Sequence, residues 1–287
     1  MRMITSLAPA KINLFLHVTG KRADGYHFLE SLVVFADYGD DISVEQADDL
    51  SLEISGPFAH DIDAGPDNLV LKAARLLQQE CGGRPGARIR LYKRLPVASG
   101  IGGGSSDAAT TLKLLNRLWR LDITDERLAK LGLSLGADVP VCLLEKPALM
   151  RGIGEELQVV KLSGISSILL VNCKKQVSTA EVFRRLTLQN TGEANFTPPV
   201  GAVEFAALLE GTRNDLQAPA IAIVPQIAEV MNAVENLDGC QFARMSGSGA
   251  TVFGLFAAAE AAEAAARRIG QQHPDWWVSA ARIMTGA

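Results

Sequence analysis

The sequence contains few cysteines and no large excess of charge of either sign, and each shortage excludes a class of protein. The four cysteines lie far apart and form no C-x-x-C pair, so neither a disulfide framework nor a zinc knuckle is expected. The 28 basic and 32 acidic residues give a formal net charge of −4, whereas a general nucleic-acid binder needs a net basic surface. The four histidines are isolated from one another and from the cysteines, so no metal-ligand spacing is present.

Long apolar runs are also missing. The longest, Ala250–Ala266, is interrupted by Glu260 and Glu263 and falls short of the roughly 20 residues that span a membrane. The apolar stretch Ile4–Leu7 is shorter than the core of a signal peptide. We therefore expect a reduced, cytoplasmic protein that binds neither nucleic acid nor a membrane.

The composition does supply a core. Apolar residues make up 48% of the 287 positions, and this length suits about two domains. Strand-like segments precede and separate helical ones without strict alternation, and no internal repeat is visible. We therefore expect an α+β fold in two halves, with Arg151–Gly164 as the crossing between them.

Local patterns predict individual elements. Alternation over Ile12–His17 predicts a half-buried strand, and the polar cluster Asp37–Asp41 predicts a turn between short strands at 32–35 and 42–45. A helix is expected to begin near Asp67, whose side chain caps it. The same rules predict further elements: a strand at 89–91, a helix at 105–120, a helix capped by Thr124 and ending near Gly136, strands at 168–171 and 251–256, helices at 203–209, 227–236 and 257–269, and a loop over 187–203.

The richest local signal is the glycine- and serine-rich segment Pro96–Asp107, between a predicted strand and a predicted helix. Glycine lets backbone N–H groups turn toward a ligand, and the N-terminus of the following helix adds partial positive charge. The hydroxyls of Ser105 and Ser106 can meet phosphate oxygens. The pattern therefore predicts a phosphate-binding loop; the alternative is a flexible linker, which would not run directly into a strongly periodic helix.

Two common nucleotide-binding loops do not fit this segment. A Walker A loop has a lysine after its glycines, and none follows here. A dinucleotide-binding fingerprint fits at Gly100 and Gly102, but its third glycine falls on Ser105 and no acidic strand end follows about 20 residues on. An oxidoreductase is therefore disfavoured, and the cation that phosphates require has to come from elsewhere in the chain.

Two charged residues are candidates for chemistry. Lys11 and Asn13 share one face of the first predicted strand, although a lysine at such a place is usually an edge charge in water. Asp138 lies in an otherwise apolar segment just after a predicted helix, where an unpaired carboxylate is costly. A capping or turn aspartate is the alternative interpretation of Asp138.

Two more segments are less specific. Met245–Gly249 predicts a small-residue turn leading into a strand, and it is not a nucleophile elbow because Arg244 stands where that motif needs its first glycine. Four basic residues before the loop predict a solvated strand face rather than a nucleic-acid patch: Arg88, Arg90, Lys93 and Arg94.

Taken in order, Lys11–Leu14, Pro96–Ser106 and Met245–Gly249 resemble the three motifs of the GHMP kinases, the family of galacto-, homoserine, mevalonate and phosphomevalonate kinases. Gly20–His27 and Leu135–Pro140 resemble the members that act on a CDP-linked methylerythritol. The resemblance implies two α+β domains, at 1–157 and 158–287, with the active site in the cleft between them.

The resemblance also implies roles for particular residues. Asp138 would be the base toward the substrate hydroxyl, and Lys11 its cationic neighbour, either keeping the carboxylate ionised or orienting phosphate. ATP would be the co-substrate, with Mg²⁺ on its phosphates and no protein ligand assigned to that ion. The loop that wraps the ATP phosphates would comprise Pro96, Val97, Ala98, Ser99, Gly100, Ile101, Gly102, Gly103, Gly104, Ser105 and Ser106.

The resemblance extends to the acceptor substrate. Asn13 would lie near the transferred hydroxyl, while Tyr26 and His27 would recognise cytidine with Phe183 on the opposite face of the base. Core packing is the alternative for Tyr26 and Phe183. Many family members carry glycine where this chain has Ala98, so that position either needs no positive φ or is strained.

The implied function is ATP-dependent phosphorylation of the 2-hydroxyl of the CDP-linked methylerythritol, in the non-mevalonate route to isoprenoid precursors. One alternative is a GHMP kinase for another small alcohol, such as mevalonate or homoserine, with which CDP should not compete. Another is a phosphate-sensing module without chemistry, which leaves Lys11 and Asp138 unexplained. The sequence does not determine the oligomeric state.

Overall fold

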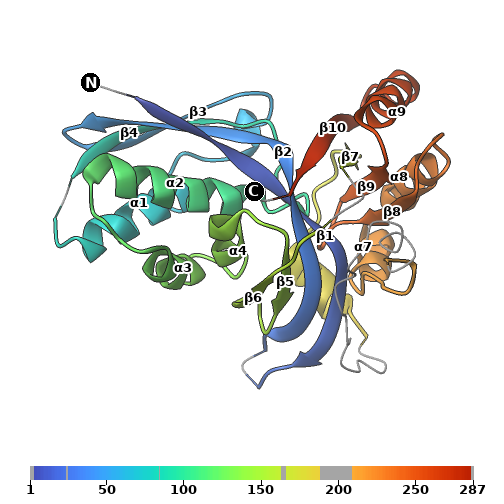
Figure 1. Ribbon diagram of the computed structural model, residues 1–287, viewed down its shortest axis with the longest axis horizontal. Helices are drawn as coiled ribbons and strands as arrows, with labels where there is room; N and C mark the ends of the chain where they lie inside the picture. Colours follow the sequence, from blue (N-terminus) through green and yellow to red (C-terminus); the bar gives the residue numbers. More distant parts are fainter. Residues whose placement is uncertain (1–2, 24, 84, 163–165, 188–208, 286–287) are drawn as a thin grey trace. The chain divides into compact units, whose positions relative to one another are not determined.

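The computed structural model describes residues 3–285 except 24, 84, 163–165 and 188–208. Its mixture of helices and strands confirms the expected α+β class (Figure 1). The strands are β1 (Ile4–Lys21), β2 (His27–Ala47), β3 (Leu50–Ser55), β4 (Gly86–Tyr92), β5 (Ala148–Arg151), β6 (Glu156–Val159), β7 (Ser167–Asn172), β8 (Phe242–Met245), β9 (Thr251–Phe256) and β10 (Trp277–Met284). The helices are α1 (Leu69–Glu80), α2 (Gly103–Trp119), α3 (Asp125–Leu133), α4 (Val139–Leu144), α5 (Thr179–Arg185), α7 (Gln217–Ile223), α8 (Gln226–Glu235) and α9 (Ala259–Gln272), with a short 3₁₀ turn at Ala59–Asp61.

The chain divides into two compact units that are discontinuous in sequence. Unit 1 comprises residues 1–10, 39–97 and 102–144, and unit 2 comprises residues 11–38, 98–101 and 145–287. In unit 1, β4 pairs antiparallel with the second part of β2 and parallel with β3. Helices α1 and α2 pack against each other, and α2 also contacts α3 and α4. The division of the chain at residue 157 stays a prediction.

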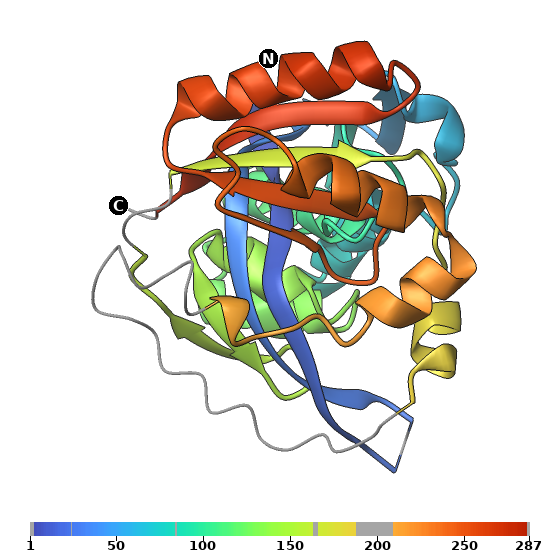
Figure 2. The ribbon, with the colours of Figure 1, turned by 90° about the vertical axis from the view of Figure 1, so that its right-hand side faces the viewer.

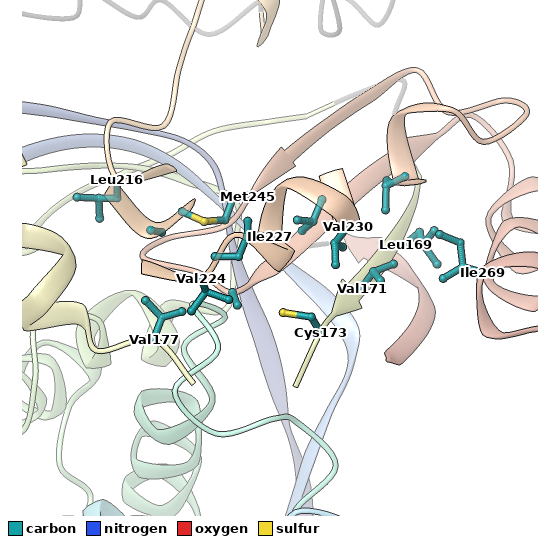
Figure 3. Packing of buried hydrophobic residues seen from close by; sticks show 14 of the residues in the cluster. Leu169, Val171, Cys173, Val177, Leu216, Val224, Ile227, Val230, Met245 and Ile269 are labelled. Carbon is teal, nitrogen blue, oxygen red and sulfur yellow. The ribbon is translucent and has the colours of Figure 1, made fainter. Parts of the chain in front are cut away.

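Unit 2 is built on the antiparallel strand order β10-β7-β9-β8. Helices α8 and α9 run along these strands in Figure 2. Leu169 and Val171 of β7 point toward Val230 of α8 and Ile269 of α9, as Figure 3 shows, and all four side chains are buried. This apolar cluster holds the sheet that carries the turn at Met245–Gly249.

The opening strand is buried on both faces, so the expectation of a half-buried strand was wrong. Every residue from Ala8 to Val18 is buried, including the polar ones. Alternation of residue types therefore reflects two chemically different buried faces rather than a core face and a solvent face.

The turn expected at Asp37–Asp41 is also absent, because β2 runs unbroken through it. Gly39 permits close approach of another strand, since an added Cβ would lie 2.0 Å from the Ala8 carbonyl oxygen. The Asp40 carboxylate accepts the backbone N–H groups of Arg94 at 2.6 Å and Leu95 at 2.9 Å. Residues typical of turns here serve packing and an internal hydrogen-bond network instead.

Helix ends were predicted with mixed success. Thr124 caps α3 as expected, accepting the N–H of Arg127. The cap of α1 is Asn68, whose side chain accepts the N–H of Val70, and not Asp67. The C-cap of α3 is Ser134, two residues before the predicted end near Gly136.

The predicted strands at 89–91, 168–171 and 251–256 and the helices at 105–120, 227–236 and 257–269 are confirmed within a few residues. The predicted loop at 187–203 and helix at 203–209 lie almost wholly outside the described residues. Among the described residues, no helix has the length and apolarity needed to cross a membrane.

Candidate functional site

Three sequence motifs that lie far apart in the chain meet at the buried hydroxyl of Ser246. Its Oγ accepts the backbone N–H of Asn13 at 3.0 Å and donates to the Gly100 carbonyl oxygen at 2.9 Å. Ser246 is fully buried, and all three residues belong to unit 2. One side chain therefore fixes the first strand, the glycine loop and the Met245–Gly249 turn relative to one another.

Two positions at this junction leave no room for a side chain and therefore require glycine. Gly100 has φ +76°, and a Cβ there would lie 2.4 Å from the Ser246 carbonyl oxygen. Gly247 has φ +54°, and its Cβ would lie 2.7 Å from the Gly100 carbonyl oxygen. Both contacts are shorter than any real Cβ contact, so the loop and the turn pack backbone against backbone.

Backbone hydrogen bonds from two other segments of unit 2 fix the middle of the glycine loop. The backbone N–H of Lys11 donates to the Ile101 carbonyl at 3.0 Å, and the N–H of Thr251 donates to the Ser99 carbonyl at 3.0 Å. Ala98 has φ +51°, so this position does need a positive φ, and the alanine there carries backbone strain.

The loop runs into the N-terminus of α2. Gly102 is the N-cap in the left-handed conformation, and the first turn of the helix contains no acidic residue. The N–H of Ser106 makes the first helical bond, to the Gly102 carbonyl at 2.8 Å, so the N–H groups before it lack intrahelical acceptors. The Ser106 hydroxyl is buried and has no hydrogen-bond partner in the described part of the chain. These donors suit an anion such as phosphate.

Lys11 and Asn13 are both buried, at 3% and 1% exposure, so Lys11 is not an edge charge in water. The Asn13 amide donates to Ser31 Oγ at 2.7 Å, and that hydroxyl donates to the Phe15 carbonyl at 2.6 Å. These bonds orient the amide. The Asn13 Oδ1 atom is left buried and without a donor within the residues that the structure describes.

Asp138 directly precedes α4 in unit 1, where its side chain is half-buried and its carbonyl accepts the N–H of Cys142 at 3.1 Å. Lys11 belongs to unit 2, so the pairing of Lys11 with Asp138 stays a prediction.

The aromatic residues expected to bind cytidine are partly brought together. The rings of His27 and Phe183 stack, with centroids 4.9 Å apart and an interplanar angle of 24°. Burial, with the charge of Lys21, lowers the pKa of His27, so the ring is neutral at pH 7. Tyr26, in the turn between β1 and β2, is 59% exposed.

The basic run before the loop is not a uniformly solvated face. Arg88 and Arg90 form ion pairs with Glu45 and Glu53, as a strand face would. Lys93 is only 3% exposed, because its side chain points into the interior of unit 1 and pairs there with two buried carboxylates.

Two residues that support the site were not singled out from the sequence. Asn214 is buried, and its Nδ2 donates to the carbonyls of Met245 at 2.8 Å and Gly247 at 2.9 Å. Arg244, taken only as a reason against a nucleophile elbow, donates to the carbonyls of Leu14 and Thr212 at 3.0 and 2.7 Å. No sequence signal separates a buried amide or guanidinium from an exposed one.

Within the described residues, no group of three or more His, Cys, Asp or Glu side chains could hold a metal ion.

Comparison with known proteins gives a consistent result. Residues 68–146 match the model of the GHMP kinases N-terminal domain, and residues 202–275 match that of the GHMP kinases C-terminal domain. The chain is 49% identical over 279 residues to a 4-diphosphocytidyl-2-C-methyl-D-erythritol kinase of Paramagnetospirillum magneticum, covering 97% of this chain and 98% of that protein.

Solved structures agree. A crystal structure of 4-(cytidine 5'-diphospho)-2C-methyl-D-erythritol kinase matches with a TM-score of 0.78 and 33% identity, covering 99% of this chain and 100% of that one. A homoserine kinase from Cytophaga hutchinsonii matches with a TM-score of 0.77 and 15% identity, covering 99% and 96% of the two chains, a likeness that shows the fold alone.

Proposed function

The chain belongs to the GHMP kinase family, and from this premise we propose that it transfers the γ-phosphate of ATP to the 2-hydroxyl of 4-diphosphocytidyl-2-C-methyl-D-erythritol. This reaction belongs to the non-mevalonate route to isoprenoid precursors. The observation that supports the chemistry is the junction at Ser246, which joins the first strand to the glycine loop and the Met245–Gly249 turn. Relatives about half identical over nearly their whole length support the substrate.

We propose that the loop Pro96–Ser106 and the first turn of α2 bind the ATP phosphates. Free N–H groups, the helix dipole and the unpartnered Ser106 hydroxyl all favour an anion there. Mg²⁺ enters as MgATP, and no protein ligand is assigned to it. The ion neutralises charge on the phosphates, while the loop holds the nucleotide in line for transfer.

Asp138 and Lys11 are the proposed catalytic residues. Asp138 accepts the proton of the attacking 2-hydroxyl, and the Lys11 ammonium stabilises negative charge on the phosphoryl group during transfer. Lys11 also supplies a cation that the lysine-free loop lacks. The buried Oδ1 of Asn13, left without a donor in the described part of the chain, suits the substrate hydroxyl as a hydrogen-bond acceptor.

Substrate choice is assigned to Tyr26, His27 and Phe183. The stacked rings of His27 and Phe183 form a flat, partly apolar platform suited to a pyrimidine, and the exposed ring of Tyr26 lies next to His27 in the chain. We assign the phosphate loop and catalytic residues to a domain at 1–157 and the second domain to 158–287, with the reaction taking place in the cytoplasm.

The test is a phosphate-transfer assay with MgATP and a panel of alcohols. Phosphorylation of the CDP-linked methylerythritol, inhibited competitively by CDP, is the expected result. Turnover of mevalonate or homoserine that CDP does not inhibit would assign the chain to another acceptor. ATP binding with no turnover of any alcohol would instead support a sensing module.

A further inference from the structure

A buried ion cluster lies in unit 1, next to Gly103 at the start of α2. The ammonium group of Lys93 pairs with the carboxylates of Asp40 and Asp107, the latter at 2.8 Å. The exposed fractions of the three side chains are 3%, 0% and 4%. We call these three residues the Lys93 triad.

The triad connects the two ends of the segment that carries the loop. Lys93 comes directly after β4 and just before Pro96, whereas Asp107 lies in the first turns of α2. Their ion pair therefore closes the loop at its base, and closure of a loop this short lowers its conformational freedom. Asp40 fixes the entry strand as well, because it accepts the N–H groups of Arg94 and Leu95.

The triad is also close to the phosphate-binding turn. A Cβ added to Gly103, the first residue of α2, would lie 3.1 Å from Lys93 Nζ. A charge on the triad therefore acts on the same helical turn whose N–H groups are proposed to bind phosphate.

The triad contains two carboxylates and one ammonium, so it carries a net charge of −1 when both acids are ionised. Burial raises the pKa of Asp107 to about 7; the charge of Lys93 opposes this shift and the charge of Asp40 adds to it. Burial alone would lower the pKa of Lys93, but the two carboxylates outweigh it and keep the ammonium charged. Helices α1, α3 and α4 also pack on α2, yet none of their described residues supplies a charge that shifts Asp107.

We propose that Lys93, Asp40 and Asp107 are positioning residues for the nucleotide: the triad closes the glycine loop at its base, and ionisation of Asp107 weakens the binding of nucleotide phosphates. This inference rests on the proposed use of ATP. Protonated Asp107 can still accept a hydrogen bond from Lys93, so protonation removes the net charge and preserves the closure. Ionised Asp107 leaves a negative charge behind an anion-binding turn.

Two substitutions separate closure from charge. Asp107→Asn keeps an acceptor for Lys93 and cannot ionise, so it imitates the protonated residue at every pH. Asp107→Ala removes the closing contact. Glu80→Gln is the matched control, because it removes a carboxylate from an ion pair with Arg127 that joins α1 to α3 on the surface of the same unit.

The dissociation constant of ADP is measured by calorimetry at about pH 6 and about pH 8.5, with KM for ATP and kcat alongside. Wild type and Asp107→Asn are expected to bind ADP equally at the lower pH. At the higher pH the wild type should bind about tenfold more weakly than Asp107→Asn, the order of effect of one nearby charge. Asp107→Ala should weaken ADP binding and raise KM for ATP at both values while kcat changes less, and Glu80→Gln should follow the wild type.

The charge effect is overturned if the ratio of the ADP affinities of wild type and Asp107→Asn is the same at both pH values. This holds even if Asp107→Asn changes the stability of the protein. Normal ADP affinity in a folded Asp107→Ala would overturn the closure. If Asp107→Ala does not fold, the near-isosteric Asp107→Asn still decides the proposal through its pH profile. Wild-type protein that binds ADP but transfers no phosphate would contradict the proposed function and leave the triad's test intact.

Discussion

His17 is a buried imidazole in β1 whose environment fixes its charge. It is 4% exposed, and its Nε2 accepts the N–H of Arg213 at 3.0 Å, which requires a neutral ring. Burial, followed by the charge of Arg213, lowers its pKa from 6.5 to about 4. A histidine in the unfolded chain takes up its proton first as the pH falls, so the folded state loses relative stability from about pH 6.5 down to about pH 4.

His17→Gln should remove part of this acid sensitivity, because an amide can accept the same N–H without titrating. The free energy of unfolding in urea, measured across that pH range, should fall less steeply for His17→Gln than for the wild type. His60→Gln, at an exposed histidine, is the control and should keep the wild-type slope. Parallel slopes for His17→Gln and wild type would show that His17 does not carry the effect.

Phe183 is expected to act on the acceptor substrate alone. Phe183→Ala removes the ring stacked on His27 and should raise KM for the CDP-linked substrate about tenfold, leaving KM for ATP unchanged. Trp276→Ala breaks another aromatic–histidine stack, with His273 at 3.8 Å, and should change neither constant. Equal effects of Phe183→Ala on both Michaelis constants would point to core packing instead.

At the scale of elements, the segment just before α7 ties β1 to the Met245–Gly249 turn. Asn214 bridges to Leu16 of β1, and its amide donates to two carbonyls of the turn. Asp215 accepts the N–H of Val18 at 2.7 Å. The Met245–Gly249 turn, whose Ser246 binds the Gly100 carbonyl, is thus stabilised by hydrogen bonds from the segment before α7.

Asn214→Asp keeps the acceptor for the Leu216 N–H but faces two carbonyl oxygens with a carboxylate. The free energy of unfolding should fall by about 1–3 kcal/mol, and KM for ATP should rise. Asn236→Asp is the control, since its amide bonds at the exposed end of α8 to Asn232, and it should cost little. A stability of Asn214→Asp equal to that of the control would contradict the assigned role.

The sequence predicted α2, α8 and α9 within a few residues and the irregular glycine-rich segment before α2, because helical periodicity and glycine clusters are local signals. It did not predict α4, α5 or α7. It failed where tertiary contacts override local preference. Asp37–Asp41 has the composition of a turn, but the contacts of Gly39 and Asp40 keep it in a strand. Grouping Lys93 with Arg88 on one solvated face was wrong, because Lys93 follows Arg88 by an odd number of residues and so points to the opposite face of an extended strand. There it pairs with two buried carboxylates.

At the scale of the whole molecule, the three sequence motifs indicated the family and the site better than the predicted helices and strands did. The three family motifs were identified from the sequence, and their meeting at Ser246 is a structural finding. The supporting residues Asn214 and Arg244 lie outside those motifs or at their border, and their burial depends on contacts that no local pattern specifies. The roles of Lys11 and Asp138 rest on the family resemblance and on chemistry.

The most direct measurement is the turnover of Asp138→Asn with MgATP and the CDP-linked methylerythritol, together with its affinity for ADP. An amide cannot accept the hydroxyl proton, so kcat should fall by about 10²–10⁴-fold, while the ADP dissociation constant stays within about twofold of wild type. Turnover near that of the wild type in Asp138→Asn would contradict the assignment of Asp138 as the base.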